Sequence, residues 1–170
     1  MAVSILITGP ECSGKSSITQ LLSSQLSSTV VDEYARSYLN NLANEYQQTD
    51  LEKIIQGQYK LEREALQSGS DYVILDTGPV VLCIWSLVKY SAVSPFLMNW
   101  LNQAQYDHVF LCKPDFPWKY DPLREHSQQR EELFQRYEQK LQELNWKYTV
   151  LEDGPEKRKE TVLKTIKFIP

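Results

Sequence analysis

The chain has 170 residues, 42% of them hydrophobic and 24% charged, and a formal net charge of −4. This length suits a single domain over residues 1–170, and no apolar run approaches the roughly 18 residues of a membrane span. The acidic balance argues against a nucleic-acid surface, and three cysteines without metal-ligand spacing indicate reduced thiols in the cytoplasm.

The first predicted strand runs directly into a phosphate-binding sequence. Residues 3–7 are a short apolar run, and the start of the chain lacks the basic segment of a signal peptide. Residues 9–16 match the pattern G-x-x-x-x-G-K-[ST] at every position. In such a loop, successive backbone N–H groups and the following helix N-terminus surround the phosphates of a nucleotide. We therefore expect ATP to bind at Gly9, Glu11, Cys12, Ser13, Gly14, Lys15, Ser16 and Ser17.

Strand and helix patterns alternate along the rest of the chain. Four further strands are predicted over residues 29–31, 72–75, 108–111 and 148–151. Helices are expected after the phosphate loop, from a Thr49–Glu52 capping box, after Pro79, after Pro95, over about 128–144 and after Pro155. The alternation predicts an α/β fold, a P-loop kinase-like three-layer sandwich with a five-stranded parallel sheet. Ligands of such sheets bind at the carboxyl ends of the strands.

Acidic residues follow two of these strands. Asp76 comes after the Tyr-Val-Ile-Leu strand, in the context of an acid that binds Mg²⁺ or its water shell together with Ser16; the alternative is a helix N-cap. Glu33 ends the second strand, where a general base for an acceptor hydroxyl is expected; the alternative is a salt bridge to Arg36. Asp32 is expected to face solvent.

Cations near the other strand ends have competing interpretations. Lys15 is expected to reach the β- and γ-phosphates. Arg124 is expected to neutralise charge that develops on the transferring phosphoryl group; the alternative is an exposed arginine. Arg130 fits better as an exposed residue with acidic neighbours one helical turn away. Lys157, Arg158 and Lys159 alternate with acids and are interpreted as a solvated helix face.

An ordered set of motifs resembles a known family. Its members recur in one order from about residue 3 to 158: Gly9–Ser17, Glu33-Tyr34-Ala35-Arg36, Gly57-Gln58, Asp76-Thr77, Ile84-Trp85, Tyr106-Asp107, Pro114-Asp115-Phe116-Pro117-Trp118, Asp121-Pro122-Leu123-Arg124 and Asp153-Gly154. Together they are similar to the ribosylnicotinamide kinase domain of the NAD-biosynthesis regulator NadR and its stand-alone relatives. The phosphate loop alone is shared by many unrelated proteins, whereas the Glu-Tyr-Ala-Arg and Pro-Asp-x-Pro-Trp elements are much more specific.

This resemblance implies an activity and a set of roles. The family uses ATP and Mg²⁺ to phosphorylate the 5′-hydroxyl of nicotinamide riboside, which gives nicotinamide mononucleotide. By motif, a lid spans about 113–130 and carries Arg124, and Gly154 lies near the adenine. Aromatic faces attract a flat cationic pyridinium, although each aromatic side chain has packing as an alternative. Substrate-binding roles are implied for Tyr34, Arg36, Trp85, Asp115 and Trp118.

The chain also departs from the family. Gly78 stands where we expect an aspartate, and Asp32 stands where proline is more common. The sequence begins at the kinase strand and has no His-x-Gly-His nucleotidyltransferase motif, so we expect neither the DNA-binding nor the adenylyltransferase activity of the regulator. Two alternatives stay open. One is a kinase of another nucleoside or nucleotide, although the Asp-Arg-[Tyr/Phe] signature is absent; the other is a non-enzymatic ATP-dependent switch.

Overall fold

Five parallel strands form the centre of the computed structural model, which describes residues 2–120 and 129–169. The buried strand β1 (Val3–Thr8) lies in the middle of the sheet, and the order across the sheet is β2-β3-β1-β4-β5. Strands covered on both faces read as continuous apolar runs. The other four strands are β2 (Ser28–Val31), β3 (Tyr72–Asp76), β4 (His108–Cys112) and β5 (Tyr148–Leu151).

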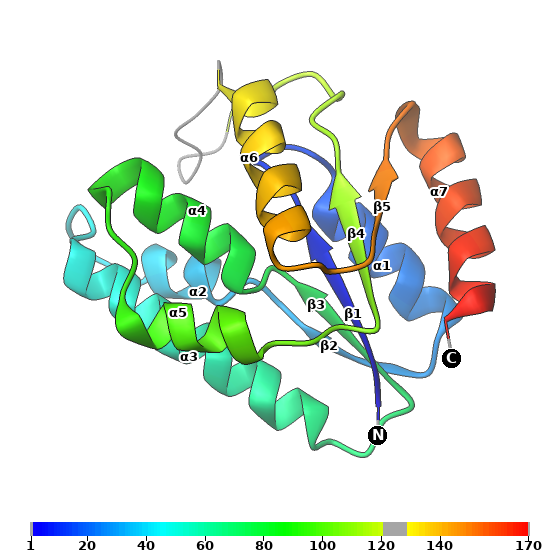
Figure 1. Cartoon of the computed structure of the whole chain (residues 1–170), viewed down its shortest axis with the longest axis horizontal. Coiled ribbons are helices and arrows are strands. Elements are labelled where there is room, and N and C mark those ends of the chain that lie inside the picture. Colours follow the sequence, from blue (N-terminus) through cyan, green and yellow to red (C-terminus); the bar gives the residue numbers. More distant parts are fainter. Residues whose placement is uncertain (1, 121–128, 170) are drawn as a thin grey trace.

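Helices cover both faces of this sheet, and they give a three-layer sandwich (Figure 1). On one face, α1 (Lys15–Gln25) and α7 (Gly154–Thr165) bury Ile18, Leu22 and Val162 against β1 and its neighbours. The short 3₁₀ helix η1 (Ile166–Phe168) follows α7. The opposite face carries α2 (Tyr34–Asn40), α3 (Gln48–Leu66), α4 (Pro79–Tyr90), α5 (Pro95–Gln103) and α6 (Arg130–Glu143). The predicted fold class is therefore confirmed.

Two local predictions differ from the structure. The capping box of α3 is formed by Gln47 and Asp50, not by Thr49 and Glu52, because the Asp50 carboxylate accepts a 2.9 Å bond from the Gln47 backbone N–H. The Tyr38 hydroxyl donates a 2.8 Å bond to the same carboxylate and ties the start of α3 to α2. The helix α2 itself, seven residues long, was not predicted.

The segment after β4 begins as an irregular loop. Residues 113–120 form no helix or strand. Arg124 falls within 121–128, outside the described residues. No helix among the described residues is both long enough and apolar enough to cross a membrane.

The parallel arrangement brings the carboxyl ends of all five strands to one edge of the sheet. Because neighbouring strand ends share this edge, the loop after β1 lies beside the residues that follow β3 and β4. A site for a small ligand is expected at this edge.

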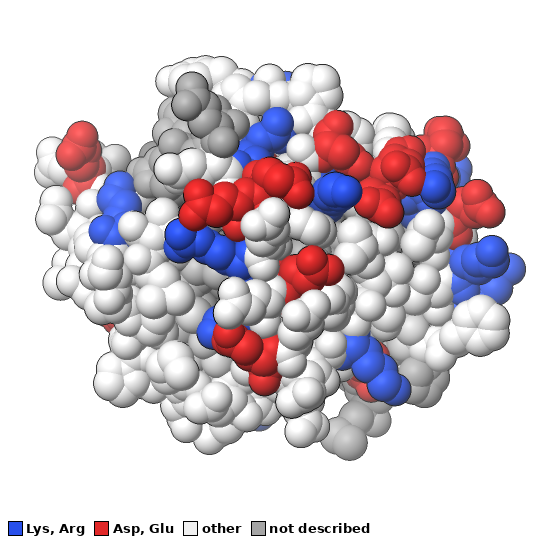
Figure 2. All heavy atoms as spheres, turned by 45° about the horizontal axis from the view of Figure 1, so that its top comes forward, with Lys and Arg blue, Asp and Glu red and all other residues white. Residues whose placement is uncertain are grey.

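Acidic and basic side chains stand next to one another on the face shown in Figure 2, and no continuous basic area is visible there among the described residues.

Candidate active site

The phosphate-binding loop is shaped by two glycines that no other residue would replace without strain. Gly9 has a φ of 139°, and a Cβ atom there would lie 2.5 Å from the Cys112 carbonyl oxygen. Gly14 is the N-cap of α1, with a φ of 84°. These conformations let the loop fold tightly and leave the N-terminus of α1 pointing at the cavity.

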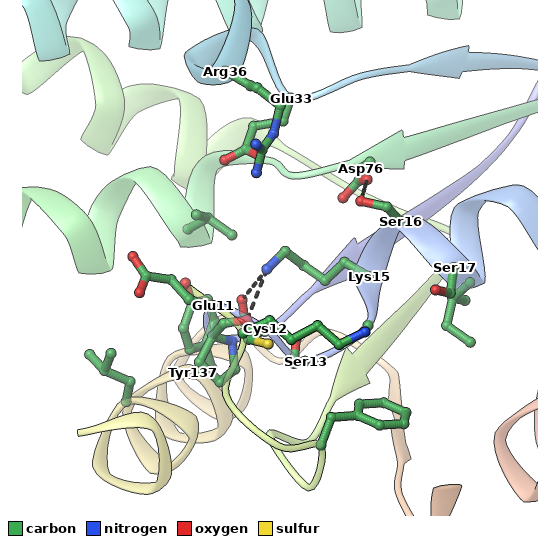
Figure 3. Close-up of a pocket in the computed structure, with 18 of the residues that line it drawn as sticks. Glu11, Cys12, Ser13, Lys15, Ser16, Ser17, Glu33, Arg36, Asp76 and Tyr137 are labelled. Atoms are coloured by element: carbon green, nitrogen blue, oxygen red, sulfur yellow. Dashed lines mark hydrogen bonds and ion pairs between the residues drawn. The ribbon is translucent and has the colours of Figure 1, made fainter. Parts of the chain in front are cut away.

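Lys15 lies across this loop. Its Nζ donates 2.9 Å hydrogen bonds to the carbonyl oxygens of Gly9 and Pro10 (Figure 3). Both bonds are to neutral carbonyls, which a phosphate oxygen with a full negative charge would outcompete as acceptor. The lysine is thus held where a phosphate would meet it.

Ser16 and Asp76 meet at the junction of α1 and β3. The Ser16 hydroxyl donates a 2.9 Å bond to Asp76 Oδ2, and Asp76 is only 7% exposed. Mg²⁺ prefers oxygen ligands and usually combines one or two protein groups with phosphates and water. Among the described residues, no three His, Cys, Asp or Glu side chains are grouped to hold a metal. The pair therefore fits a magnesium ion that also binds the phosphates of a nucleotide.

A cavity of about 970 Å³ extends from the phosphate loop between β3, α2, α4 and α6. Glu33 and Arg36 lie on one side of it in Figure 3, and Glu11 and Tyr137 lie on the other. This volume is at the upper end of the range for small-molecule sites. The cavity therefore has room for a second ligand beside a nucleotide.

Glu33 and Arg36 form the ion pair that was the alternative to a catalytic role. Arg36 Nε lies 3.8 Å from Glu33 Oε2, and the two side chains are 49% and 35% exposed. An exposed pair of this length contributes little to stability. Because both residues also line the cavity, the pair is compatible with contact to a ligand.

The end of the cavity away from the phosphate loop is aromatic. Trp85 Nε1 donates a 3.0 Å bond to the Tyr46 hydroxyl, and the two rings are T-shaped with centroids 5.3 Å apart. Lys89 Nζ lies 4.3 Å from the centre of the Tyr46 ring. Trp85 was expected here from the sequence, whereas Tyr46 was not singled out because it precedes α3 in a polar stretch without a motif.

Tyr137 is a second lining residue that sequence analysis missed. It is buried on α6, and burial together with the negative charges of Glu11 and Glu33 raises the pKa of its hydroxyl. The phenol therefore stays protonated and can donate a hydrogen bond into the cavity. Its only signal in the sequence was the helical spacing of Leu133, Tyr137 and Leu141.

Arg158 departs from the interpretation of residues 157–159 as a solvated face, which holds for the exposed Lys157 and Lys159. It is 1% exposed, and it donates 2.5 Å bonds to the carbonyl oxygens of Ser13 and Lys113. It also forms an ion pair with Asp115, and its guanidinium lies 4.4 Å from the centre of the Phe116 ring. The reason is tertiary: α7 packs against the phosphate loop and the segment after β4, which supply the acceptors that the burial of an arginine demands.

Three predicted substrate residues, Tyr34, Asp115 and Trp118, are not among the residues that line the cavity. Asp115 faces Arg158, and its other oxygen accepts a 2.8 Å bond from the Asp153 N–H. Tyr34 packs its ring against α3 at Gly57. Their predicted contact with substrate remains a prediction.

The segment after β4 is tied to α6 by an arginine. Arg130 Nη1 donates a 2.9 Å bond to the Phe116 carbonyl oxygen, and its guanidinium lies 5.6 Å from the centre of the Trp118 ring. Arg130 is therefore half-buried and contacts this segment, in contrast to the exposed position we expected.

Gly154 adopts a φ of 84° at the start of α7, next to the residue Pro155, which lines the cavity.

Gly78, where we expected an aspartate, lies against a buried side chain. A Cβ atom there would lie 2.8 Å from Leu6 Cδ1 and 3.5 Å from the Tyr106 hydroxyl. An aspartate at this position would have to displace a fully buried leucine. The site consequently has one carboxylate, Asp76, at this strand end.

Comparisons with known proteins agree with this geometry. A family model described as an AAA domain matches residues 4–159. The trifunctional NAD biosynthesis/regulator protein NadR of Escherichia coli is 26% identical over 157 residues, 88% of this chain and 38% of that protein. The chain thus spans well under half the length of this curated relative.

Solved structures share the fold. A NadR protein in complex with NR superposes with a TM-score of 0.82 at 18% identity, over 99% of this chain and 50% of that chain. Deoxyadenosine kinase from M. mycoides superposes with a TM-score of 0.71 at 16% identity, over 98% of this chain and 100% of that chain. At these identities the likeness establishes a P-loop kinase fold.

Proposed function

The chain belongs to the family described as an AAA domain, and from this premise we propose that it is an ATP- and Mg²⁺-dependent kinase. Its proposed acceptor is the 5′-hydroxyl of nicotinamide riboside, and the product is nicotinamide mononucleotide, made for NAD salvage in the cytoplasm. The observation that carries the proposal is that Lys15, Asp76 and Glu33 surround one cavity (Figure 3). The resemblance to NadR, which has been solved with NR, supports this choice of acceptor.

The phosphate loop would hold ATP at one end of the cavity. Lys15 would leave the carbonyls of Gly9 and Pro10 for the β- and γ-phosphates. Ser16 and Asp76 would hold Mg²⁺, which would neutralise negative charge on the phosphates. The N-terminus of α1 adds its dipole to this charge stabilisation.

Glu33 would prepare the acceptor. Its carboxylate, on the cavity wall, would accept the proton of the 5′-hydroxyl as the bond from that oxygen to the γ-phosphorus forms and the bond to the ADP oxygen breaks. Arg36, paired with Glu33 at 3.8 Å, would hold the carboxylate in place. Arg124 in the lid over about 113–130 would add positive charge to the transferring group.

The aromatic end would receive the base of the acceptor. Lys89 already lies over the Tyr46 ring, so a cationic pyridinium would stack on Trp85 and not on that face of Tyr46. Trp118 on the lid is proposed to complete the pocket.

A second candidate is a kinase of a neutral nucleoside. It is favoured by the match to deoxyadenosine kinase over 98% of this chain and the whole of that chain. The mixed charges of Arg36, Glu45 and Lys89 at the acceptor end are equally able to form hydrogen bonds with a neutral base.

The test is ADP release from Mg-ATP with nicotinamide riboside, compared with uridine, cytidine, thymidine, deoxyadenosine and nucleoside monophosphates. Selective turnover of nicotinamide riboside is the expected result. Turnover of a neutral nucleoside alone would replace the acceptor and keep the reaction. Tight ATP binding without turnover of any acceptor would contradict the kinase and favour a nucleotide-dependent switch.

A further inference from the structure

Gln58 of α3 lies buried where the pairing of β2 and β3 ends. Its side chain is 1% exposed, and the last paired residues of the two strands are Val31 and Leu75. Beyond them, the two backbones no longer bond to each other. The Gln58 amide occupies this position, and its contacts are all with main-chain groups.

Two of these contacts are made to the residues directly before and after Glu33. Gln58 Oε1 accepts a 2.8 Å bond from the Tyr34 N–H, and Nε2 donates a 3.2 Å bond to the Asp32 carbonyl oxygen. One side chain thus holds the backbone on both sides of the residue that lines the cavity. The peptide units next to Glu33 cannot rotate without breaking a bond to a buried amide, which is costly.

The same amide reaches the other strand end. Nε2 also lies 3.5 Å from the carbonyl oxygen of Thr77, the residue after Asp76. Thr77 has a φ of 91°, a conformation that a β-branched residue adopts only when its surroundings enforce it. Its N–H donates to the Ile7 carbonyl oxygen at 3.2 Å, and Gln58 supplies the contact on the carbonyl side.

The neighbouring Gly57 explains how α3 comes close enough. A Cβ atom at position 57 would lie 2.2 Å from the Tyr34 ring. Glycine inside a helix costs about 1 kcal/mol relative to alanine. This cost is offset here because the missing side chain lets α3 dock directly on the turn that carries Glu33.

We propose that Gln58 is a positioning residue, which fixes Glu33 relative to Asp76 across the ends of β2 and β3. It touches neither the cavity nor a ligand, and it acts through the backbone of Asp32, Tyr34 and Thr77. The inference rests on the proposed function for the role of Glu33, whereas the placement of Asp76 depends only on nucleotide binding.

The test uses Gln58→Met, which keeps the length of the side chain and removes its hydrogen bonds. Gln56→Met, on the exposed side of the same helix, is the matched control. We expect kcat with the acceptor to fall about 10- to 100-fold in Gln58→Met, with a much smaller rise in the KM for ATP, because displacement of catalytic groups by about 1 Å has effects of this size. The control should retain the kcat of the unmodified protein.

Gln58→Glu sharpens the test. The introduced carboxyl can donate to the Asp32 and Thr77 carbonyls only when protonated, and it repels them when ionised. The ratio of its kcat to that of the unmodified protein should therefore fall as pH rises, whereas the ratio for Gln56→Glu should stay flat. A simple loss of packing would not produce this dependence. If Gln58→Met fails to fold, the pH dependence of kcat in Gln58→Glu, compared with that in Gln56→Glu, still tests the positioning role.

A binding measurement separates this proposal from the proposed function. The affinity for ADP is measured once with Mg²⁺ and once with EDTA. The factor by which Mg²⁺ increases this affinity should be at least about threefold smaller in Gln58→Met than in the unmodified protein. The affinity in EDTA should be the same for both proteins. If the unmodified protein phosphorylates no acceptor, the proposed function fails and this measurement alone decides. The positioning role would be overturned if Gln58→Met kept both the kcat and the Mg²⁺-dependent increase in ADP affinity of the unmodified protein. It would also be overturned if Gln58→Met lost as much ADP affinity in EDTA as it loses with Mg²⁺.

Discussion

Arg158 and Asp115 form an ion pair beside the phosphate-binding loop, although they lie 43 positions apart in the chain. The arginine side chain is 1% exposed and the aspartate side chain 26% exposed. Through Arg158, the pair also holds the carbonyl oxygen of Ser13 in the loop and that of Lys113 after β4. The shape of the nucleotide site thus depends on α7, which follows the last strand.

Arg158→Ala should therefore be strongly destabilising. It removes a buried cation, the donor to two carbonyls and the counter-ion of the Asp115 carboxylate, which keeps only the bond from the Asp153 N–H, so we expect a loss of about 3 kcal/mol in the free energy of unfolding. Urea unfolding measures it. Lys157→Ala is the control, because its ion pair with Asp153 is exposed and its removal should leave the midpoint nearly unchanged. A similar midpoint for both variants would show that the burial of Arg158 does not matter.

Lys15→Ala should abolish turnover and leave the fold intact. The lysine donates hydrogen bonds to two carbonyls of its own loop, so its loss removes little from the protein itself. Removal of one charged donor from a phosphoryl-transfer site lowers kcat by about 10²- to 10³-fold or more. Circular dichroism and ADP release are the measurements. Substantial turnover in a folded variant would exclude Lys15 from contact with the phosphates.

Glu33→Gln separates base catalysis from binding. The amide keeps the size of the carboxylate and cannot accept the proton, so kcat should fall about 10²- to 10⁴-fold, with little change in the KM for ATP. Asp32→Asn is the matched control, since Asp32 is exposed one residue earlier. If kcat stays unchanged in Glu33→Gln, Asp76 becomes the next candidate for the base.

Trp85→Ala and Trp118→Ala test the acceptor end. Trp85 lines the cavity and packs on Tyr46, so its loss should raise the KM for nicotinamide riboside more than the KM for ATP. Trp118 contacts Arg130 and is proposed to act through the lid, with the same preference for nicotinamide riboside. Steady-state kinetics with each substrate varied would show it. Equal weakening of both substrates by Trp118→Ala would mean that this residue only supports the lid.

The strands and the phosphate loop were predictable because their signals are local. The apolar run before Gly9, the glycine spacing and the acid that ends β3 all lie within short windows, and the sheet then brings them together. Arg158 was not predictable in this way. Its neighbours suggest a solvated face, and only Ser13 and Asp115, distant in the chain, explain its burial. Gln58 likewise looks like an ordinary polar helix residue until α3 docks on the end of β2.

Glu62 gives a prediction about stability and pH. It is 3% exposed on α3, and it accepts bonds from Trp100 Nε1 at 3.2 Å and from the Tyr106 hydroxyl at 2.9 Å. Burial raises its pKa from 4.5 to about 7, against the lowering effect of these two bonds and of Arg63. The folded protein therefore binds this proton more tightly than the unfolded chain does.

The sign of the pH effect follows from this difference. Below about pH 4.5 the carboxyl is protonated in both states, so its contribution to stability is fully present. As pH rises from 4.5 to about 7, that contribution is lost, and at about 1.4 kcal/mol per pKa unit the loss approaches about 3 kcal/mol. Above pH 7 it changes no further.

Glu62→Gln should remove this dependence. The neutral amide can still accept from Trp100 and donate to the Tyr106 oxygen, so the variant should resemble the unmodified protein at pH 4.5 and be more stable at pH 8. Urea unfolding at both pH values measures the difference. Glu64→Gln on the exposed side of α3 should show no such gain. If the stability of Glu62→Gln and of the unmodified protein changes equally between these pH values, ionisation of the buried Glu62 carboxyl does not destabilise the fold. The hydrogen bonds from Trp100 and Tyr106 would then compensate fully for the burial of its charge.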